Sequence, residues 1–286
     1  MESNTHGLSD IAYITVDIPT HIYPILGYLS ELEAQGIIYD VYGPKNIMKN
    51  GLEKRGQNQF GFEELIWDNE DISKFFEVTY QSFLKTVPEI EALWKNNEKK
   101  PKLIIGDMAA PYAKYLAKKH DIPLLVFHAN YFASQLSEKH FHERMTAELE
   151  KCQRGESLFS LQKEVENKYN VTIENGRQMP IEGDRNISCL PAFLGDPITF
   201  KNDKFSYIGP AFRDENTNNN ERFEIDSEFI QEDKTLIYVS LGTFPANIPG
   251  FSFYEIIIDV LGDTEHNVLI SVAFGKAEEL IARGLP

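Results

Sequence analysis

The sequence predicts an α/β protein with a parallel sheet, followed by the beginning of a second sheet domain. Short apolar strands alternate with helical patterns along the first half of the 286 residues, which is typical of βαβ units with right-handed crossovers. A second strand–helix–strand–helix run starts near residue 234 and continues to residue 286. Two strands and two helices are too few to bury both faces of a parallel sheet, so we expect this second domain to be incomplete.

Hydrophobic periodicity places the elements in order. Strands of the first domain are predicted at 11–16, 37–42, 65–67, 103–106, 122–128, 187–190 and 205–208. Helices are predicted at 22–32, 72–94 and 110–119, and one or two more in the charged segment 132–170. The second domain is predicted to begin with a strand that runs into a glycine turn at 234–243, followed by a strand at 267–274 and helices at 251–262 and 276–283. The polar stretch 214–224 lacks periodicity, so we interpret 214–233 as a linker between domains 1–213 and 234–286.

Composition and charge exclude several classes of function. The net charge of −16 and the pI near 4.9 argue against a nucleic-acid partner or an anionic membrane surface. The two cysteines, Cys152 and Cys189, give neither a metal-binding spacing nor a disulfide framework. The N-terminal residues do not resemble a signal peptide, and no run of apolar residues is long enough for a membrane span. We therefore expect a cytoplasmic protein.

Two polar residues follow neighbouring strands of the predicted sheet. His21 comes shortly after the first strand, and Asp107 directly follows the fourth. In the common strand order 3-2-1-4-5 these strands are adjacent, and ligands bind beyond their carboxyl ends. A carboxylate that orients a histidine forms a general-base pair, because it fixes the tautomer and stabilises the imidazolium. The alternatives are a surface-loop histidine and an aspartate that caps the following helix.

Five short motifs occur in the order found in the family-1 UDP-sugar glycosyltransferases of GT-B fold, in particular the macrolide glycosyltransferase-like branch. The segments that resemble the family motifs are Thr20–Pro24, Leu103–Asp107, Asp121–Pro123, Tyr207–Pro210 and Val239–Thr243. Thr20 stands where the family usually has glycine. Each motif is weak alone, but the five together cover nearly the whole chain.

The resemblance implies a Rossmann-like N-terminal acceptor domain and the start of a second Rossmann-like domain. It implies inverting transfer of a hexose from a UDP-sugar to a hydroxyl of a small apolar acceptor, without a metal or other cofactor. His21 is then the base and Asp107 its partner. The implied donor-binding residues are Ser240, Gly242 and Thr243, and the acceptor-binding candidates are Phe83, Asn130, Tyr131 and Phe132.

The sequence departs from the family after the second strand of the second domain. The family's later phosphate loop and sugar-binding pair are not found, so we expect most of the donor site to be lacking. The alternative function is a non-catalytic acceptor-binding protein or one subunit of a split enzyme. We also expect self-association through the incomplete second domain.

Several of these residues also have a simpler structural interpretation. The turn at 240–243 is also explained as a plain strand-to-helix turn. Phe83 belongs to an aromatic stripe with Phe76 and Tyr80 that is first of all core packing. His140 and His142 do not share a helix face, so we interpret them as solvated residues rather than metal ligands.

Overall fold

The computed structural model describes most of the chain. The described residues are 7–16, 18–45, 52, 55–62, 72–129, 155–171, 181–195, 202–211, 230–231, 233–240, 251–272 and 276–282. The chain separates into two compact units.

The first unit is a parallel sheet with helices on both faces. Its strands are β1 (Ile11–Ile14), β2 (Asp40–Pro44), β3 (Gln59–Phe62), β4 (Leu103–Asp107), β5 (Leu124–His128), β6 (Arg185–Ser188) and β7 (Phe205–Tyr207). Its helices are α1 (Pro19–Ala34), α2 (Ile72–Asn96), α3 (Pro111–His120), α5 (Gly155–Tyr169) and the short 3₁₀ helix η3 (Ala192–Leu194). The seven strands lie in the order β3-β2-β1-β4-β5-β6-β7, and every neighbouring pair is parallel. The predicted α/β fold with a parallel sheet is confirmed.

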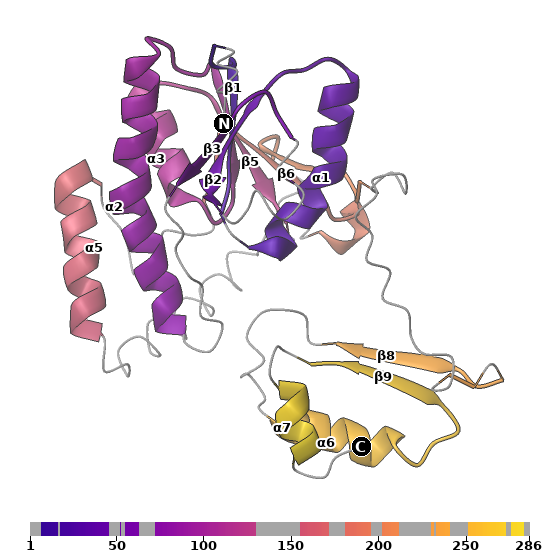
Figure 1. Ribbon diagram of the computed structural model, residues 1–286. Coiled ribbons are helices and arrows are strands. Elements are labelled where there is room, and N and C mark those ends of the chain that lie inside the picture. Colours follow the sequence, from indigo (N-terminus) through magenta and orange to yellow (C-terminus); the bar gives the residue numbers. More distant parts are fainter. Residues whose placement is uncertain are drawn as a thin grey trace. The chain divides into compact units, whose positions relative to one another are not determined.

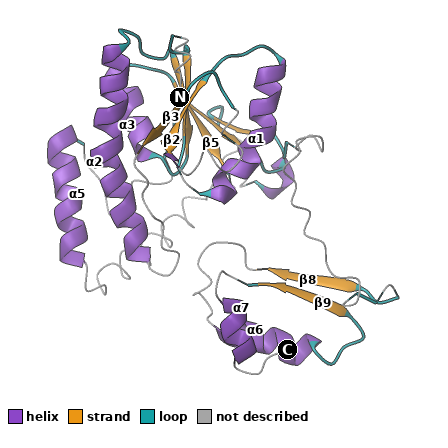
Figure 2. Cartoon of the chain, in the orientation of Figure 1, coloured by secondary structure: helices purple, strands orange, loops and turns teal. Residues whose placement is uncertain are grey.

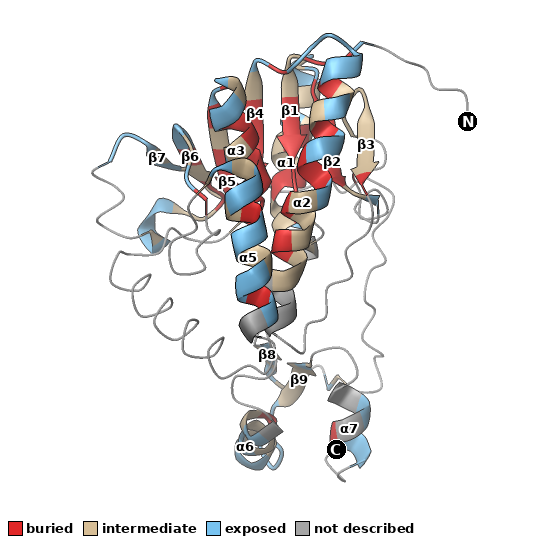
Figure 3. Ribbon diagram, turned by 90° about the vertical axis from the view of Figure 1, so that its left-hand side faces the viewer, coloured by how far each residue is buried: buried red, intermediate tan, exposed pale blue. Residues whose placement is uncertain are grey.

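The helices form two layers around the sheet. Helix α1 lies on one side of the sheet, α2 and α3 lie on the other, and α5 runs along the outside of α2 (Figure 1). Parallel strands covered on both faces are apolar throughout, and the central strands β1 and β4 are almost entirely buried (Figure 3).

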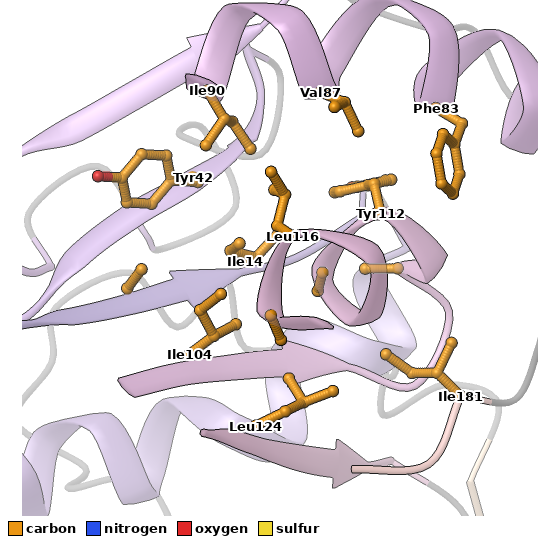
Figure 4. Close-up of a cluster of buried hydrophobic side chains, with 14 of the residues drawn as sticks. Ile14, Tyr42, Phe83, Val87, Ile90, Ile104, Tyr112, Leu116, Leu124 and Ile181 are labelled. Atoms are coloured by element: carbon orange, nitrogen blue, oxygen red, sulfur yellow. The ribbon is translucent and has the colours of Figure 1, made fainter. Parts of the chain in front are cut away.

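The larger core cluster fills the space between the sheet and helices α2 and α3. Figure 4 shows Val87 and Ile90 of α2 and Leu116 of α3 facing Ile14 and Ile104 of the strands. Each of these aliphatic side chains is fully buried, which contributes roughly 1.5–3 kcal/mol relative to exposure to water. This face of the sheet is therefore covered by closely packed apolar side chains.

The smaller cluster fixes α1 on the opposite face. The sequence predicts an apolar helix face, and its residues Ile22, Ile25, Leu26 and Leu29 are buried. They pack with a second set of strand residues, among them Tyr13, Ile105 and Phe127. Side chains alternate between the two faces of a strand, so Tyr13 and Ile105 face α1 while their neighbours Ile14 and Ile104 face α2 and α3.

The third strand of the sheet lies at a position that the sequence did not predict. It spans Gln59–Phe62 and pairs with β2 at one edge of the sheet, whereas the predicted range 65–67 falls outside the described residues. The strand begins just after Gly56, whose φ of +72° is readily adopted by glycine. Its first three residues are only half-buried, so the sequence carries little of the apolar pattern from which a strand is predicted.

The second unit consists of a two-stranded sheet and two helices. Its elements are β8 (Leu236–Ser240), α6 (Phe251–Leu261), β9 (Asn267–Ser271) and α7 (Lys276–Ala282), all drawn in Figure 2. Strands β8 and β9 are parallel and in register from Leu236 opposite Asn267 to Ser240 opposite Ser271. The unit therefore has the strand–helix–strand–helix order expected from the sequence.

Within the described part of the chain, no helix combines the length and the apolar character that crossing a membrane requires.

Candidate active site

His21 lies in the first turn of α1, close to the carboxyl end of β1. The helix begins after Ile18 with Pro19, whose fixed φ and missing N–H suit the first helical position. The His21 amide donates to the Ile18 carbonyl at 2.8 Å, so the imidazole is attached to a regular turn rather than to a loop. The positive end of the helix dipole disfavours a charged imidazole at this position unless a carboxylate compensates for it.

Asp107 is the last residue of β4 and is completely buried. Its Oδ1 accepts a hydrogen bond from the Ala109 amide at 2.7 Å, which fixes the carboxyl group against the turn that leads to α3. The residue does not cap that helix, because the N-cap of α3 is Ala110 and no side chain bonds to the cap. A helix cap therefore does not explain why a carboxylate is buried here.

The sheet topology brings these two residues together. Strands β1 and β4 are hydrogen-bonded neighbours, with Ile14 opposite Gly106. Helix α1 leaves β1 toward one face, and α3 follows β4 on the other, so this is the switch point of the sheet (Figure 1). At this point the Nδ1 of His21 lies 2.9 Å from the Oδ1 of Asp107.

The two residues change each other's proton affinity. Burial lowers the pKa of His21, but the charge of Asp107 and its hydrogen bond raise that pKa by more, so the net pKa lies above the ordinary value of 6.5. An Nδ1–H that donates to the carboxylate leaves Nε2 as the basic nitrogen. The His21 side chain is 14% exposed, whereas Asp107 is 0% exposed, so the partner is sealed from solvent while the imidazole is not. The arrangement can therefore accept a proton from a bound molecule and stabilise the resulting cation.

A second histidine lies at the same edge of the sheet. His128 ends β5, one residue beyond Phe127, which is the register partner of Asp107. It is buried, and its Nε2 lies 3.4 Å from the Oδ1 of Asn186. Burial lowers the pKa of His128 to about 4, so this imidazole is neutral at physiological pH. The edge thus holds one histidine whose pKa is raised and one whose pKa is lowered.

Residues 207–211 contact α1, the helix that carries His21. The Tyr28 hydroxyl donates to the Gly209 carbonyl, and the Tyr28 ring packs edge-on against Phe127. Gly209 has a φ of +79°, and a Cβ on Gly27 would lie only 2.6 Å from the Cβ of Ala211. The close approach to Ala211 needs glycine at position 27, and the positive φ favours glycine at position 209 of the Tyr207–Pro210 motif.

The acceptor-binding candidates fall into two groups. Phe83 lies in the core cluster, where its ring packs 5.4 Å from Tyr115 and 5.0 Å from Tyr169 between ring centroids. It is only 3% exposed, so its described neighbours are core residues, and its contact with an acceptor stays a prediction. Asn130, Tyr131 and Phe132 lie outside the described residues.

The donor-binding candidates belong to the second unit. Ser240 is the last residue of β8 and is exposed, opposite Ser271 of β9. Gly242 and Thr243 lie outside the described residues, as do His140, His142 and Cys152. Among the described residues no group of three or more His, Cys, Asp or Glu side chains could hold a metal ion.

The sequence-based interpretation missed two residues of this region, His128 and Tyr13. His128 ends a strand at the same edge as Asp107, so the rule that selected Asp107 also applies to it. Tyr13 gives no such signal, because an aromatic residue within a buried strand is ordinarily a core residue.

Solved structures share this fold. The glycosyltransferase of kitacinnamycin matches 94% of this chain and 67% of its own with a TM-score of 0.69 and 19% identity. CalG4, the calicheamicin glycosyltransferase, matches 98% of this chain and 69% of its own with a TM-score of 0.63 and 17% identity. The spinosyn rhamnosyltransferase SpnG matches 91% of this chain and 64% of its own with a TM-score of 0.55 and 12% identity.

The chain thus spans about two thirds of the length of these structures. At such identities the likeness is one of fold alone: the chain shares the GT-B architecture of these structures over the part of their length that it spans. The sequence matches no protein-family model and no curated protein.

Proposed function

We propose that the protein is an inverting glycosyltransferase that transfers a hexose from a UDP-sugar to a hydroxyl of a small apolar acceptor. The observation that carries the proposal is the 2.9 Å contact between His21 Nδ1 and Asp107 Oδ1 at the switch point of the sheet. Nε2 of His21 takes the proton of the acceptor hydroxyl, and Asp107 stabilises the imidazolium. The acceptor oxygen attacks the anomeric carbon from the face opposite the leaving nucleoside diphosphate, so the configuration inverts.

We propose a different role for each of three successive parts of the chain. Residues 1–213 bind the acceptor and supply the base, 214–233 link the domains, and 234–286 begin the donor-binding part. On the acceptor side we propose Phe83, Asn130, Tyr131 and Phe132, and on the donor side Ser240, Gly242 and Thr243.

The base of the donor nucleotide, uracil or thymine, does not follow from the His21–Asp107 pair. Structures of SpnG and SsfS6 hold thymidine diphosphate, and another SpnG structure holds spinosyn aglycone. We propose a uridine nucleotide here because of the motif resemblance, so the test has to include both bases.

The test is a transfer assay with UDP-glucose and with dTDP-glucose. Each donor is incubated with the protein and a panel of phenols and macrolide aglycones, and glycosylated products are identified by mass spectrometry. The anomeric configuration of the product is then read from proton coupling constants. We expect little or no product from residues 1–286 alone. In a protein whose donor half is complete, we expect a β-glucoside that is nearly lost with His21→Ala.

Two other outcomes lead to different conclusions. A product that retains the α configuration of the donor contradicts the direct displacement. Acceptor binding by calorimetry without transfer from either donor in the completed protein supports instead an acceptor-binding protein or a split-enzyme subunit.

A further inference from the structure

Two buried polar atoms near the candidate base have no hydrogen-bond partner. Among the described residues, the hydroxyl of Tyr13 and the Oδ2 of Asp107 are the only buried side-chain polar atoms left without one. Both residues are completely buried. An unsatisfied buried polar group costs about 1–3 kcal/mol, so two such atoms in one region need an explanation.

Strand register places these two side chains on the same face of the sheet. Tyr13 of β1 is opposite Ile105 of β4, and Asp107 lies two residues farther along β4. Because side chains alternate, Tyr13, Ile105 and Asp107 share the face that α1 covers. Two residues along one strand and one strand across give a Cα separation of roughly 8 Å, which a tyrosine side chain can bridge.

Electrostatics supports this proximity. Burial and then the negative charge of Asp107 raise the pKa of Tyr13 well above its ordinary value, against a smaller lowering by the neighbouring Thr15 side chain. The hydroxyl therefore keeps its proton and can act as a hydrogen-bond donor. Asp107 Oδ1 already faces two nitrogens, those of His21 and Ala109, so Oδ2 is the oxygen that needs a donor.

We propose that Tyr13 is a positioning residue for the His21–Asp107 pair, and that its hydroxyl donates a hydrogen bond toward Asp107 Oδ2 through one bound water molecule. A buried water that links two unsatisfied polar groups is a common element of protein cores. The link holds Oδ1 toward His21 and draws part of the carboxylate charge away from the imidazole. This inference rests on the proposed function only for the statement that His21 is the base.

The proposal predicts the sign of a pKa change. Removing the donor leaves more of the Asp107 charge to act on His21, so Tyr13→Phe should raise the pKa of His21 by roughly half a unit. Asp107→Asn should lower the same pKa, because Asp107 raises it in the wild-type protein. Loss of packing alone does not move this pKa upward, because Tyr13→Phe keeps the buried ring.

The other titratable groups around the pair do not interfere with the measurement. Burial and then Asp107 raise the pKa of Tyr112 on α3, and burial and the nearby Glu33 raise the pKa of Tyr39, so both tyrosines stay protonated. The pKa of His128 is lowered to about 4, so it stays neutral in the range in which His21 titrates. Tyr39→Phe is the matched control, since it removes another buried hydroxyl from the same core cluster.

The experiment is a histidine titration by nuclear magnetic resonance on four proteins: wild type, Tyr13→Phe, Tyr39→Phe and Asp107→Asn. We expect the pKa of His21 to rise in Tyr13→Phe, to stay unchanged in Tyr39→Phe and to fall in Asp107→Asn. A wild-type sample with labelled tyrosine provides a measurement that needs no variant. In that sample the ring signals of Tyr13 should change with pH, and the midpoint of that change should equal the pKa of His21.

The outcomes separate this inference from the proposed function. If Asp107→Asn lowers the pKa of His21 but neither Tyr13→Phe nor the tyrosine signals respond, Tyr13 is only a core residue and the inference is wrong. If Asp107→Asn leaves the pKa of His21 unchanged, the pair itself does not form and the proposed base is lost with it.

Discussion

His21 and Asp107 are 86 positions apart in the sequence, yet the Nδ1 of one lies 2.9 Å from the Oδ1 of the other. The contact joins the first turn of α1 to the last residue of β4. Only the order of the strands makes these two elements neighbours. Any chemistry that uses the pair therefore depends on the sheet as much as on the two side chains.

Loss of the base should remove most transfer activity while the fold persists. In a protein whose donor half is complete, we expect His21→Ala to lower kcat by about 10²–10⁴, the usual contribution of a general base. Asp107→Asn should also lower kcat, because an amide does not offset the imidazolium charge. The two losses should be far from additive in the double variant, since the residues act as one unit. Steady-state kinetics with one phenolic acceptor measures all three.

His120→Ala is the matched control for His21→Ala. It removes another imidazole of the same unit. His120 is the last residue of α3, and its Nε2 lies 2.8 Å from the Oε1 of Glu91. Wild-type turnover in His120→Ala with near-zero turnover in His21→Ala supports the assignment. If the two single losses multiply in the double variant, the residues do not work as a pair.

Activity should depend on pH through His21. Its folded-state pKa lies above 6.5, so the neutral base is the minor form below that pKa. We expect kcat/KM to rise with pH through the His21 pKa and to level off above it. Asp107→Asn should move the midpoint of this rise to lower pH and lower the plateau. A midpoint that is identical in wild type and Asp107→Asn contradicts the coupling between the residues.

The neutral His128 should make the protein sensitive to acid. Its pKa is about 4 in the folded state and 6.5 ordinarily, so the unfolded chain binds more protons between these values. The free energy of unfolding should therefore fall as pH drops from about 6.5 to about 4, by on the order of 3 kcal/mol from this residue. Urea denaturation at several pH values measures the slope. His128→Gln should flatten it, and an unchanged slope argues that the imidazole is not held neutral.

Glycine at position 27 should be necessary for the close packing of α1. Gly→Ala in a helix normally stabilises it, but here the new Cβ would lie 2.6 Å from the Cβ of Ala211. We expect Gly27→Ala to lower the free energy of unfolding by about 1–3 kcal/mol, as other overpacked sites do. Gly7→Ala is the control, because nothing lies within 4 Å of its added Cβ. Equal stability of both variants contradicts the overpacking.

The sequence was sufficient to predict the architecture, because periodicity is a local property. The alternation of strands and helices predicts the parallel sheet, and strands β1 and β4 occur within a few residues of their predicted ranges. Strand β3 was not predicted, since an edge strand that is half-buried lacks the apolar pattern of a central one.

The candidate site was predictable only in part. His21 and Asp107 follow strand ends, which a linear sequence displays. The neutral state of His128 depends on burial by residues distant in the sequence, and no local pattern contains that information. The orphaned hydroxyl of Tyr13 depends on strand register, which the sequence of one strand does not specify.

The register of β1 against β4 also bears on how the protein reaches its native state. Ile11 pairs with Leu103, so the whole of β2, β3 and α2 lies in the loop that this pairing closes. Proteins dominated by such distant contacts fold slowly, because the entropy of a long loop is lost before the contacts form. The histidine and its carboxylate meet only when that loop closes, so the shifted His21 titration is at the same time a spectroscopic reporter of completed folding.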